Sequence, residues 1–149
     1  MAKSIKMKII YPRWEKLKGQ TTFNLPPHGP VVFAAALPER VDVSFTDENV
    51  EPVDFEESCD LVAISMMLST QVKRGWAIAA EFRKRGKKVI FGGISTMLHA
   101  EETMEHADAV FLGEAEGRME ELISDWENGE LKKVYNYMGQ LPPIELVGP

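Results

Sequence analysis

The sequence has few of the residues that several kinds of site require. Cys59 is the single cysteine among 149 residues, so the chain holds no internal disulfide, no multi-cysteine zinc site and no iron–sulfur cluster of its own. Seventeen basic residues stand against 23 acidic ones, and the resulting net charge of −6 disfavours nucleic acid as a partner. No apolar run approaches the roughly 20 residues that span a bilayer. These shortages predict a reducing, cytoplasmic setting without nucleic acid or membrane as partner.

The rest of the composition is that of one globular domain. Hydrophobic residues make up 44% of the chain and charged residues 27%. A chain of this length buries about two-thirds of its unfolded surface in a single core. The first residues lack the apolar segment and small-residue cleavage site of a secretory signal. We therefore expect one folded domain over residues 1–137, followed by a linker over residues 138–149 that contains Pro142-Pro143.

Short apolar runs alternate with helical patterns along most of the chain. Because parallel strands need crossover connections, this alternation predicts an α/β fold with a doubly wound, five-stranded parallel sheet in the order 2-1-3-4-5. A small extra strand is possible over residues 131–137. The expected strands are 8–11, 41–45, 61–64, 89–91 and 109–112, and the expected helices begin near His28, Ser69 or Thr70, Ala100 and Met119.

Ligands of open α/β sheets lie beyond the carboxyl ends of the strands. Four loops of the predicted sheet qualify: 12–29, 65–69, 92–96 and 113–116. The first is long, and its Trp14 and Phe23 predict that it packs against the domain. The other three begin with serine or glycine, which lets backbone and hydroxyl groups approach a ligand without side-chain bulk. Such a surface suits a large planar or nucleotide-like ligand.

Three common motifs of this fold class are absent. The first strand ends in Tyr11-Pro12-Arg13-Trp14, where a dinucleotide-binding domain needs Gly-x-Gly-x-x-Gly, and the chain contains no P-loop. A phosphoryl-accepting receiver domain would need an acidic pair after the first strand, an aspartate ending the third and a lysine after the fifth. Those places hold Pro12-Arg13, Ser65 and Gly113-Glu114.

Six short motifs occur in order at the ends of the predicted elements. They are Pro26-Pro27-x-Gly29, Asp47-Glu48-Asn49, Asp60-Leu61-Val62-Ala63-Ile64-Ser65, Arg83-x-Arg85-Gly86-x-Lys88-Val89, Gly92-Gly93-Ile94 and Ala107-Asp108-Ala109-Val110-x-x-Gly113-Glu114-Ala115-Glu116. Together, from Lys8 to about Tyr137, they resemble the N-terminal cobalamin-binding domain of cobalamin-dependent radical S-adenosylmethionine enzymes.

The resemblance implies a place for the cofactor. Cobalamin would lie over the carboxyl edge of the sheet, with its nucleotide tail inserted beside the third and fourth strands. Leu68 comes one residue later than in the family's tail-binding segment. Glu116 is equally consistent with a place in the site and with an acidic helix start. The implied contacts are Trp14, Gly29, Ser65, Met66, Met67, Leu68, Ser69, Gly92, Gly93, Ile94, Ser95, Gly113 and Glu114.

The cobalt ligand of the wider family is the clearest departure. Cobalamin-dependent methyltransferases and mutases carry Asp-x-His-x-x-Gly after the first strand, and this motif is absent. His28 lies in the equivalent loop beside Gly29, but Pro26 stands where the aspartate would be. His28 is therefore the candidate metal ligand, while a loop histidine without contact to cobalt is the favoured interpretation.

The resemblance implies a cobalamin-binding module with no turnover of its own, serving a larger enzyme that methylates or rearranges an unactivated carbon. S-adenosylmethionine and a [4Fe-4S] cluster would belong to a radical S-adenosylmethionine domain of the same polypeptide, because Cys59 alone cannot hold that cluster. Two alternatives stay open. One is a degenerate domain of the same fold that recognises a substrate or protein without cobalamin. The other is a flavin enzyme, although Pro12-Arg13-Trp14 offers no phosphate loop.

Overall fold

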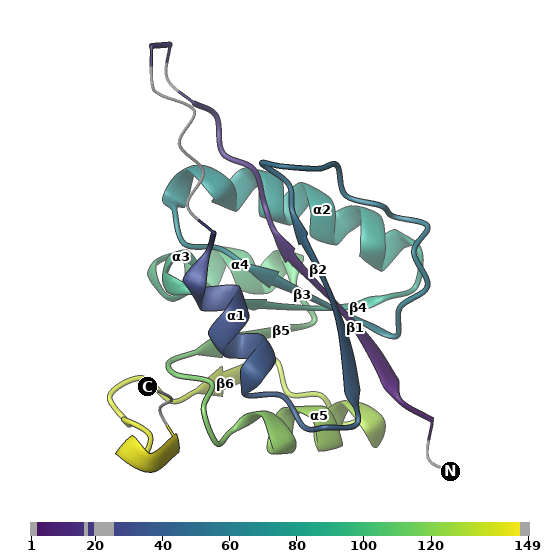
Figure 1. Cartoon of the computed structure of the whole chain (residues 1–149), viewed down its shortest axis with the longest axis vertical. Coiled ribbons are helices and arrows are strands. Elements are labelled where there is room, and N and C mark those ends of the chain that lie inside the picture. Colours follow the sequence, from purple (N-terminus) through teal and green to yellow (C-terminus); the bar gives the residue numbers. More distant parts are fainter. Residues whose placement is uncertain (1–2, 17, 20–25, 147–149) are drawn as a thin grey trace.

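The computed structural model of the chain describes residues 3–16, 18–19 and 26–146, and Phe23 lies outside them. Within these residues, six strands form one parallel sheet in the order β2-β1-β3-β4-β5-β6 (Figure 1). The strands are β1 (Ile5–Tyr11), β2 (Val41–Asp47), β3 (Leu61–Ser65), β4 (Lys88–Gly92), β5 (Ala109–Leu112) and β6 (Val134–Asn136). The helices are α1 (His28–Ala35), α2 (Val72–Lys84), α3 (Ile94–Leu98), α4 (Ala100–His106) and α5 (Met119–Glu127), with 3-10 turns at Ser69–Gln71 and Ile144–Leu146.

The predicted parallel α/β architecture is confirmed, but the prediction of five strands is wrong. β6 extends the sheet by pairing in parallel with β5, with Phe111 opposite Tyr135. Only three residues form this strand, and of these Tyr135 alone is buried. The strand lies within residues 131–137, for which a small extra strand was predicted, and the side chain of Tyr135 joins the hydrophobic cluster beneath α5.

Burial along the strands follows their place in the sheet. Residues 61–64 of β3 are all buried, as expected for a central strand with helices on both faces. β2 lies at the edge, where Val43 and Phe45 are 38% and 41% exposed. The alternating sequence Val-Asp-Val-Ser-Phe of residues 41–45 predicts a half-buried strand near the edge of the sheet. The edge position is confirmed, but the expected burial of Val43 and Phe45 is not observed.

Two connections differ from a regular alternation of strands and helices. α3 was not predicted, and it begins directly after Gly93, the residue that precedes its first turn. Residues 48–60, which the structure describes in full, join β2 to β3 without a helix. This crossover is held instead by side chains: the Phe55 ring packs 5.0 Å from the Phe82 ring, and Glu57 pairs with the buried Lys8. Among the described helices, none is long and apolar enough to cross a membrane.

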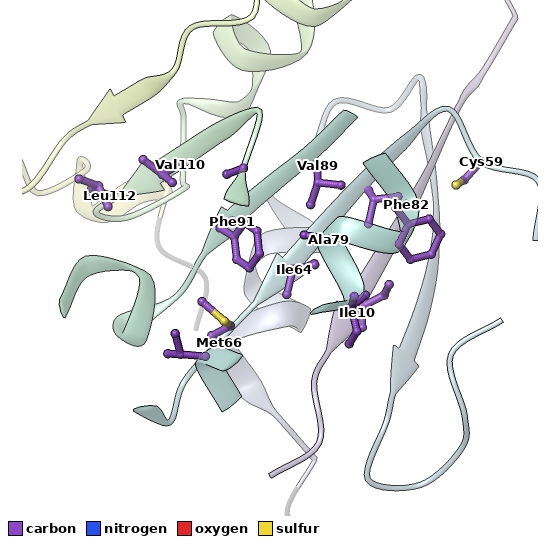
Figure 2. Packing of buried hydrophobic residues seen from close by; sticks show 14 residues of the cluster. Ile10, Cys59, Ile64, Met66, Ala79, Phe82, Val89, Phe91, Val110 and Leu112 are labelled. Carbon is purple, nitrogen blue, oxygen red and sulfur yellow. The ribbon is translucent and has the colours of Figure 1, made fainter. Parts of the chain in front are cut away.

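Each face of the sheet has its own hydrophobic core. α2 and α5 lie on opposite sides of the sheet in Figure 1. On the α2 side, shown in Figure 2, Met66 and Phe91 lie toward one end of the cluster and Cys59 at the other. The second cluster lies under α1 and α5 and includes Ala63 and Ile90. We call these the α2 face and the α1/α5 face.

Candidate functional site

Small residues end the two middle strands on the α1/α5 face. Ser65 of β3 lies directly beside Gly92 of β4 in the register of the sheet. Because alternate strand residues share a face, Ser65 and Gly92 lie on the same face as Ala63 and Ile90, two residues earlier in each strand. Gly29 in the first turn of α1 lies across from them, since a Cβ there would be 3.9 Å from Ser65 Oγ. We call Gly29, Ser65 and Gly92 the small-residue row.

The described residues leave space next to Gly92. A Cβ built on Gly92 would have no described heavy atom within 4 Å. The row is therefore a place at the carboxyl edge where a ligand can come close to the backbone of the central strands.

The α2 face is closed at the same level. Met66 and Phe91, which are chain neighbours of Ser65 and Gly92, are fully buried. The Met66 thioether fills the space above Gly75 of α2, where an added Cβ would lie 2.5 Å from its sulfur. The predicted contact of Met66 with a ligand therefore cannot be made by its side chain in this arrangement, since that side chain lies in the core.

Gly93 joins the loops that follow β3 and β4. Its φ is +94°, and an added Cβ would lie 2.4 Å from the carbonyl oxygen of Met66. Two backbone hydrogen bonds fix this contact, because Met66 N donates to Gly92 O at 3.0 Å and Ser95 N donates to Met66 O at 3.0 Å. The backbone conformation and this close contact explain why residue 93 is a glycine. No such contact with a described atom requires a glycine at position 92.

The backbone after β5 also requires a glycine, at position 113. Its φ is +114°, and an added Cβ would meet the backbone carbonyl carbon of Tyr137 at 2.8 Å. Tyr137 N donates to Leu112 O at 2.7 Å, so the chain after β6 crosses closely over this glycine.

Gln71 links the loops after β1 and β3. Its side chain is fully buried, and its Oε1 accepts hydrogen bonds of 2.8 Å from the backbone N–H groups of Met67 and Leu68. Its Nε2 donates to the carbonyl oxygen of Pro12 at 2.5 Å. One amide side chain therefore positions two of the four loops at the carboxyl edge. A buried amide with these partners satisfied is costly to replace.

Glu48 and Asn49 hold the start of the loop after β1. Arg13 N donates to Glu48 at 3.1 Å, and Trp14 N donates to Asn49 Oδ1 at 3.3 Å. Arg74 of α2 binds both oxygens of Glu48, whose side chain is only 5% exposed. Burial by itself raises the pKa of the Glu48 carboxyl, but the hydrogen bonds from Arg74 and Arg13 outweigh it and leave this pKa below its ordinary value.

Exposed apolar side chains follow the two middle strands at the carboxyl edge. Met67 directly follows Met66, and Ile94 directly follows Gly93, so both flank the row; they are 49% and 53% exposed. Leu98, one turn after Ile94 in α3, adds a 69% exposed side chain. We call these three residues the apolar rim. A row of small groups inside an apolar rim suits a large ligand that carries both apolar and hydrogen-bonding groups.

Comparison of the sequence with known proteins finds a family. The model of the B12-binding domain family matches residues 16–123, well over half of the chain, and this range contains the whole small-residue row. The chain belongs to the B12-binding domain family. The resemblance deduced from the six sequence motifs is thereby confirmed.

Two curated relatives match most of this chain. Bacteriochlorophyllide d C-8(2)-methyltransferase of Chlorobaculum tepidum is 31% identical over 119 residues, which are 79% of this chain and 26% of the relative. Bacteriochlorophyllide d C-12(1)-methyltransferase of the same organism is 30% identical over 122 residues, 80% of this chain and 26% of the relative. The chain thus spans about a quarter of the length of these relatives. No solved structure shows a significant match.

The predicted contacts of the B12-binding domain are not all in one place. Gly29, Ser65, Gly92, Met67 and Ile94 gather at the row and its rim. His28 is the exposed first residue of α1, directly before Gly29. The others occupy the surrounding loops. Trp14 packs edge-to-face on Tyr11 with ring centroids 5.9 Å apart, and Ser69 Oγ lies 3.2 Å from His99 Nε2. Leu68 is half-buried, Ser95 is buried and Glu114 is exposed. Contact with a cofactor stays a prediction for every one of these residues.

Sequence reasoning missed the residues that hold the loops of this B12-binding domain. Gln71 stands three residues after Leu68, but Leu68 has no side-chain oxygen to complete a capping box, so no sequence motif marks this glutamine. Glu48 lies inside one of the six motifs but had no assigned role. A depression of about 410 Å³, lined by Arg13, Glu48, Arg74, Val53 and Phe55 among others, also escaped notice. It lies beside the crossover loop and α2, away from the row.

Proposed function

We propose that this domain binds cobalamin over the small-residue row, with the nucleotide tail entering on the α1/α5 face beside β3 and β4. The observation that carries the proposal is the free space at Gly92 next to Ser65, at a level where Met66 and Phe91 close the other face. The family match supports the same cofactor. When bound, cobalamin supplies a cobalt atom that can carry a methyl group.

The residues around the row have separate tasks in this proposal. Gly29 and Gly92 leave room for the tail, and the Ser65 hydroxyl can donate or accept a hydrogen bond beside it. The apolar rim covers apolar parts of the cofactor and keeps water away from it. Gln71 and Glu48 fix the loops that carry these groups. We expect binding without a histidine ligand to cobalt, because His28 lacks the acidic residue two positions earlier.

We further propose that the domain serves a radical S-adenosylmethionine methyltransferase. Both curated relatives are named as methyltransferases, and each is about four times as long as the matched region. S-adenosylmethionine and a [4Fe-4S] cluster would bind to a radical S-adenosylmethionine domain of the same polypeptide, since this chain has a single cysteine. A tetrapyrrole related to the bacteriochlorophyllides named for the relatives is the candidate substrate.

A second candidate function is recognition of a substrate or protein without cobalamin. The missing Asp-x-His-x-x-Gly motif, with Pro26 in place of the aspartate, favours it. The two functions differ in what the row binds.

Titration of the purified chain with hydroxocobalamin separates these functions. We expect a change in the cobalamin absorption spectrum and co-elution of cobalamin with the protein on gel filtration. A chain that shows neither supports the second candidate. Addition of flavin mononucleotide under the same conditions tests the flavin alternative, and we expect no retention.

A further inference from the structure

Two buried side-chain oxygens near the carboxyl edge have no hydrogen-bond partner among the described residues. They are Ser95 Oγ and Glu116 Oε2. A buried polar atom without a partner loses its hydrogen bonds to water and gains none in exchange, which costs folding free energy. Native structures contain few such atoms, and each calls for an explanation.

Both oxygens belong to loops that follow neighbouring strands. Ser95 lies in the first turn of α3, directly after β4, and is fully buried. Glu116 lies between β5 and α5, and β4 pairs with β5 in the sheet. Since the carboxyl ends of parallel strands meet at one edge, both atoms are placed on the side of the molecule where the small-residue row lies.

The residue next to Ser95 shows that burial alone does not leave a hydroxyl without a partner here. Thr96 is also fully buried, and its Oγ1 donates to Gly92 O at 2.8 Å. The backbone N–H of Ser95 is satisfied as well, by Met66 O at 3.0 Å. Among the buried side-chain atoms of the part of the chain that the structure describes, the Ser95 hydroxyl and one Glu116 oxygen have no partner.

We infer that Ser95 Oγ and Glu116 Oε2 are hydrogen-bonding groups kept for bound cobalamin, an inference that rests on the proposed function. An ionised carboxylate only accepts hydrogen bonds, so its partner must carry N–H or O–H groups. Cobalamin offers both, as amide side chains around the corrin ring and as a hydroxyl on the ribose of its tail. The two oxygens would accept hydrogen bonds from these groups and so contribute to the specificity of the domain for cobalamin.

Because both oxygens are buried, a ligand can reach them only if neighbouring atoms move. Ser95 follows Ile94, whose side chain is 53% exposed. An added Cβ at Gly117, next to Glu116, would lie 2.8 Å from a methyl carbon of Leu146, so the segment after β6 contacts this loop. Leu146 is itself 52% exposed. Both loops therefore carry exposed side chains that can change position without disturbing a core.

The test compares stability and binding in Ser95→Ala and Glu116→Gln. Each change removes or weakens an unsatisfied buried group, so we expect the melting temperature without cofactor to stay the same or rise. We expect the dissociation constant for hydroxocobalamin to rise about tenfold for Ser95→Ala and several-fold for Glu116→Gln. Opposite effects on stability and on binding are the signature of a group kept for a ligand.

Thr96→Val is the matched variant, since it removes a hydroxyl that already has a partner. It should lower the melting temperature. Ser58→Ala and Glu105→Gln, at exposed positions away from the row, serve as surface controls and should change neither quantity. A Ser95→Ala variant that melts lower than the unaltered chain but binds cobalamin equally well would overturn the inference and assign the hydroxyl a structural role.

Dicyanocobinamide, which keeps the corrin amides but lacks the nucleotide tail, identifies the donor. A weakening that persists with cobinamide assigns the oxygen to a corrin amide, and a weakening seen only with hydroxocobalamin assigns it to the tail. If every variant binds both ligands as tightly as the unaltered chain does, the inference is contradicted while the proposed function stands. Failure of the unaltered chain to bind hydroxocobalamin would instead overturn the proposed function, and the inference with it.

Discussion

The two faces of the sheet differ sharply at the carboxyl edge, although the residues that form them are neighbours in the chain. On the α2 face, Met66 and Phe91 fill the space under the helix and are fully buried. On the α1/α5 face at the same level, Ser65 and Gly92 leave space. Because successive strand residues point to opposite faces, one residue step separates a packed core from an open site.

The difference shows how the fold separates stability from binding. The large side chains on the α2 face supply packing, and their loss would be felt as lost stability. The small residues on the other face contribute little packing, so substitutions there should act on the ligand first. Each prediction below tests one part of this division, beginning with the turn where the two faces meet.

Gly93→Ala should have the largest effect. The residue needs a φ of +94°, and its Cβ would lie 2.4 Å from the Met66 carbonyl oxygen. We expect a loss of more than about 3 kcal/mol in the free energy of unfolding, measured by urea denaturation. Gly86→Ala is the control, because Gly86 has a φ of +79° but no described atom within 4 Å of an added Cβ. It should cost about 1 kcal/mol, and equal losses in both variants would contradict the close contact with Met66.

Gly92→Leu should separate binding from stability. An added Cβ meets no described atom within 4 Å, so we expect the free energy of unfolding to change by less than about 1 kcal/mol. The same side chain would occupy the space proposed for the nucleotide tail, and hydroxocobalamin binding should fall about 100-fold or more. The binding titration above measures it. Unchanged affinity in a well-folded variant would place the tail elsewhere.

Much of this division could be predicted from the sequence, because it depends on local patterns. β5 occupies residues 109–112 as expected, since a four-residue apolar run is bounded by Asp108 and Gly113. Ser65 and Gly92 could be placed at the carboxyl edge for the same reason. The distinction between Gly92 and Gly93 could not, because it depends on the path of the backbone beside Met66, 27 residues earlier in the chain.

The parts that were missed depend on contacts between distant residues. Gln71 joins Met67 to Pro12, and no local pattern indicates a hydrogen bond that spans 59 residues. α3 begins with Ile94, Ser95 and Thr96, of which the first is exposed and the other two are buried polar residues, so no apolar face indicated a helix. β6 was not missed altogether, since it lies within residues 131–137, where a small extra strand was predicted, but its pairing with β5 could not be predicted.

Glu48→Gln tests how much the Glu48 carboxylate, which holds the loop after β1, contributes to stability as the pH falls. Glu48 has a pKa below its ordinary value of 4.5, so its ionised form stabilises the folded state above that pH, and this contribution is lost as the pH falls through the lower folded value. We expect the variant to be about 2 kcal/mol less stable at pH 7, with the difference shrinking below pH 4.5. Thermal melts between pH 7 and pH 3 measure it.

Glu56→Gln is the control for this measurement. The Glu56 side chain is 79% exposed, and the substitution breaks its surface ion pair with Arg85. It should change stability by less than about 0.5 kcal/mol at any of these pH values. A Glu48→Gln variant with the same small, pH-independent effect would show that the loop after β1 does not depend on this carboxylate.

His28→Ala should have the smallest effect. The imidazole is exposed at the start of α1, and a metal-binding histidine normally needs a partner such as a carboxylate to orient its ring, a place that Pro26 holds here. We expect less than about a twofold change in hydroxocobalamin affinity and an unchanged cobalamin spectrum in the bound state. If this substitution alone abolished binding and shifted the cobalt spectrum, His28 would be the lower ligand. Cobalamin binding on the α1/α5 face would then depend on the His28 side chain rather than on the space above Gly92.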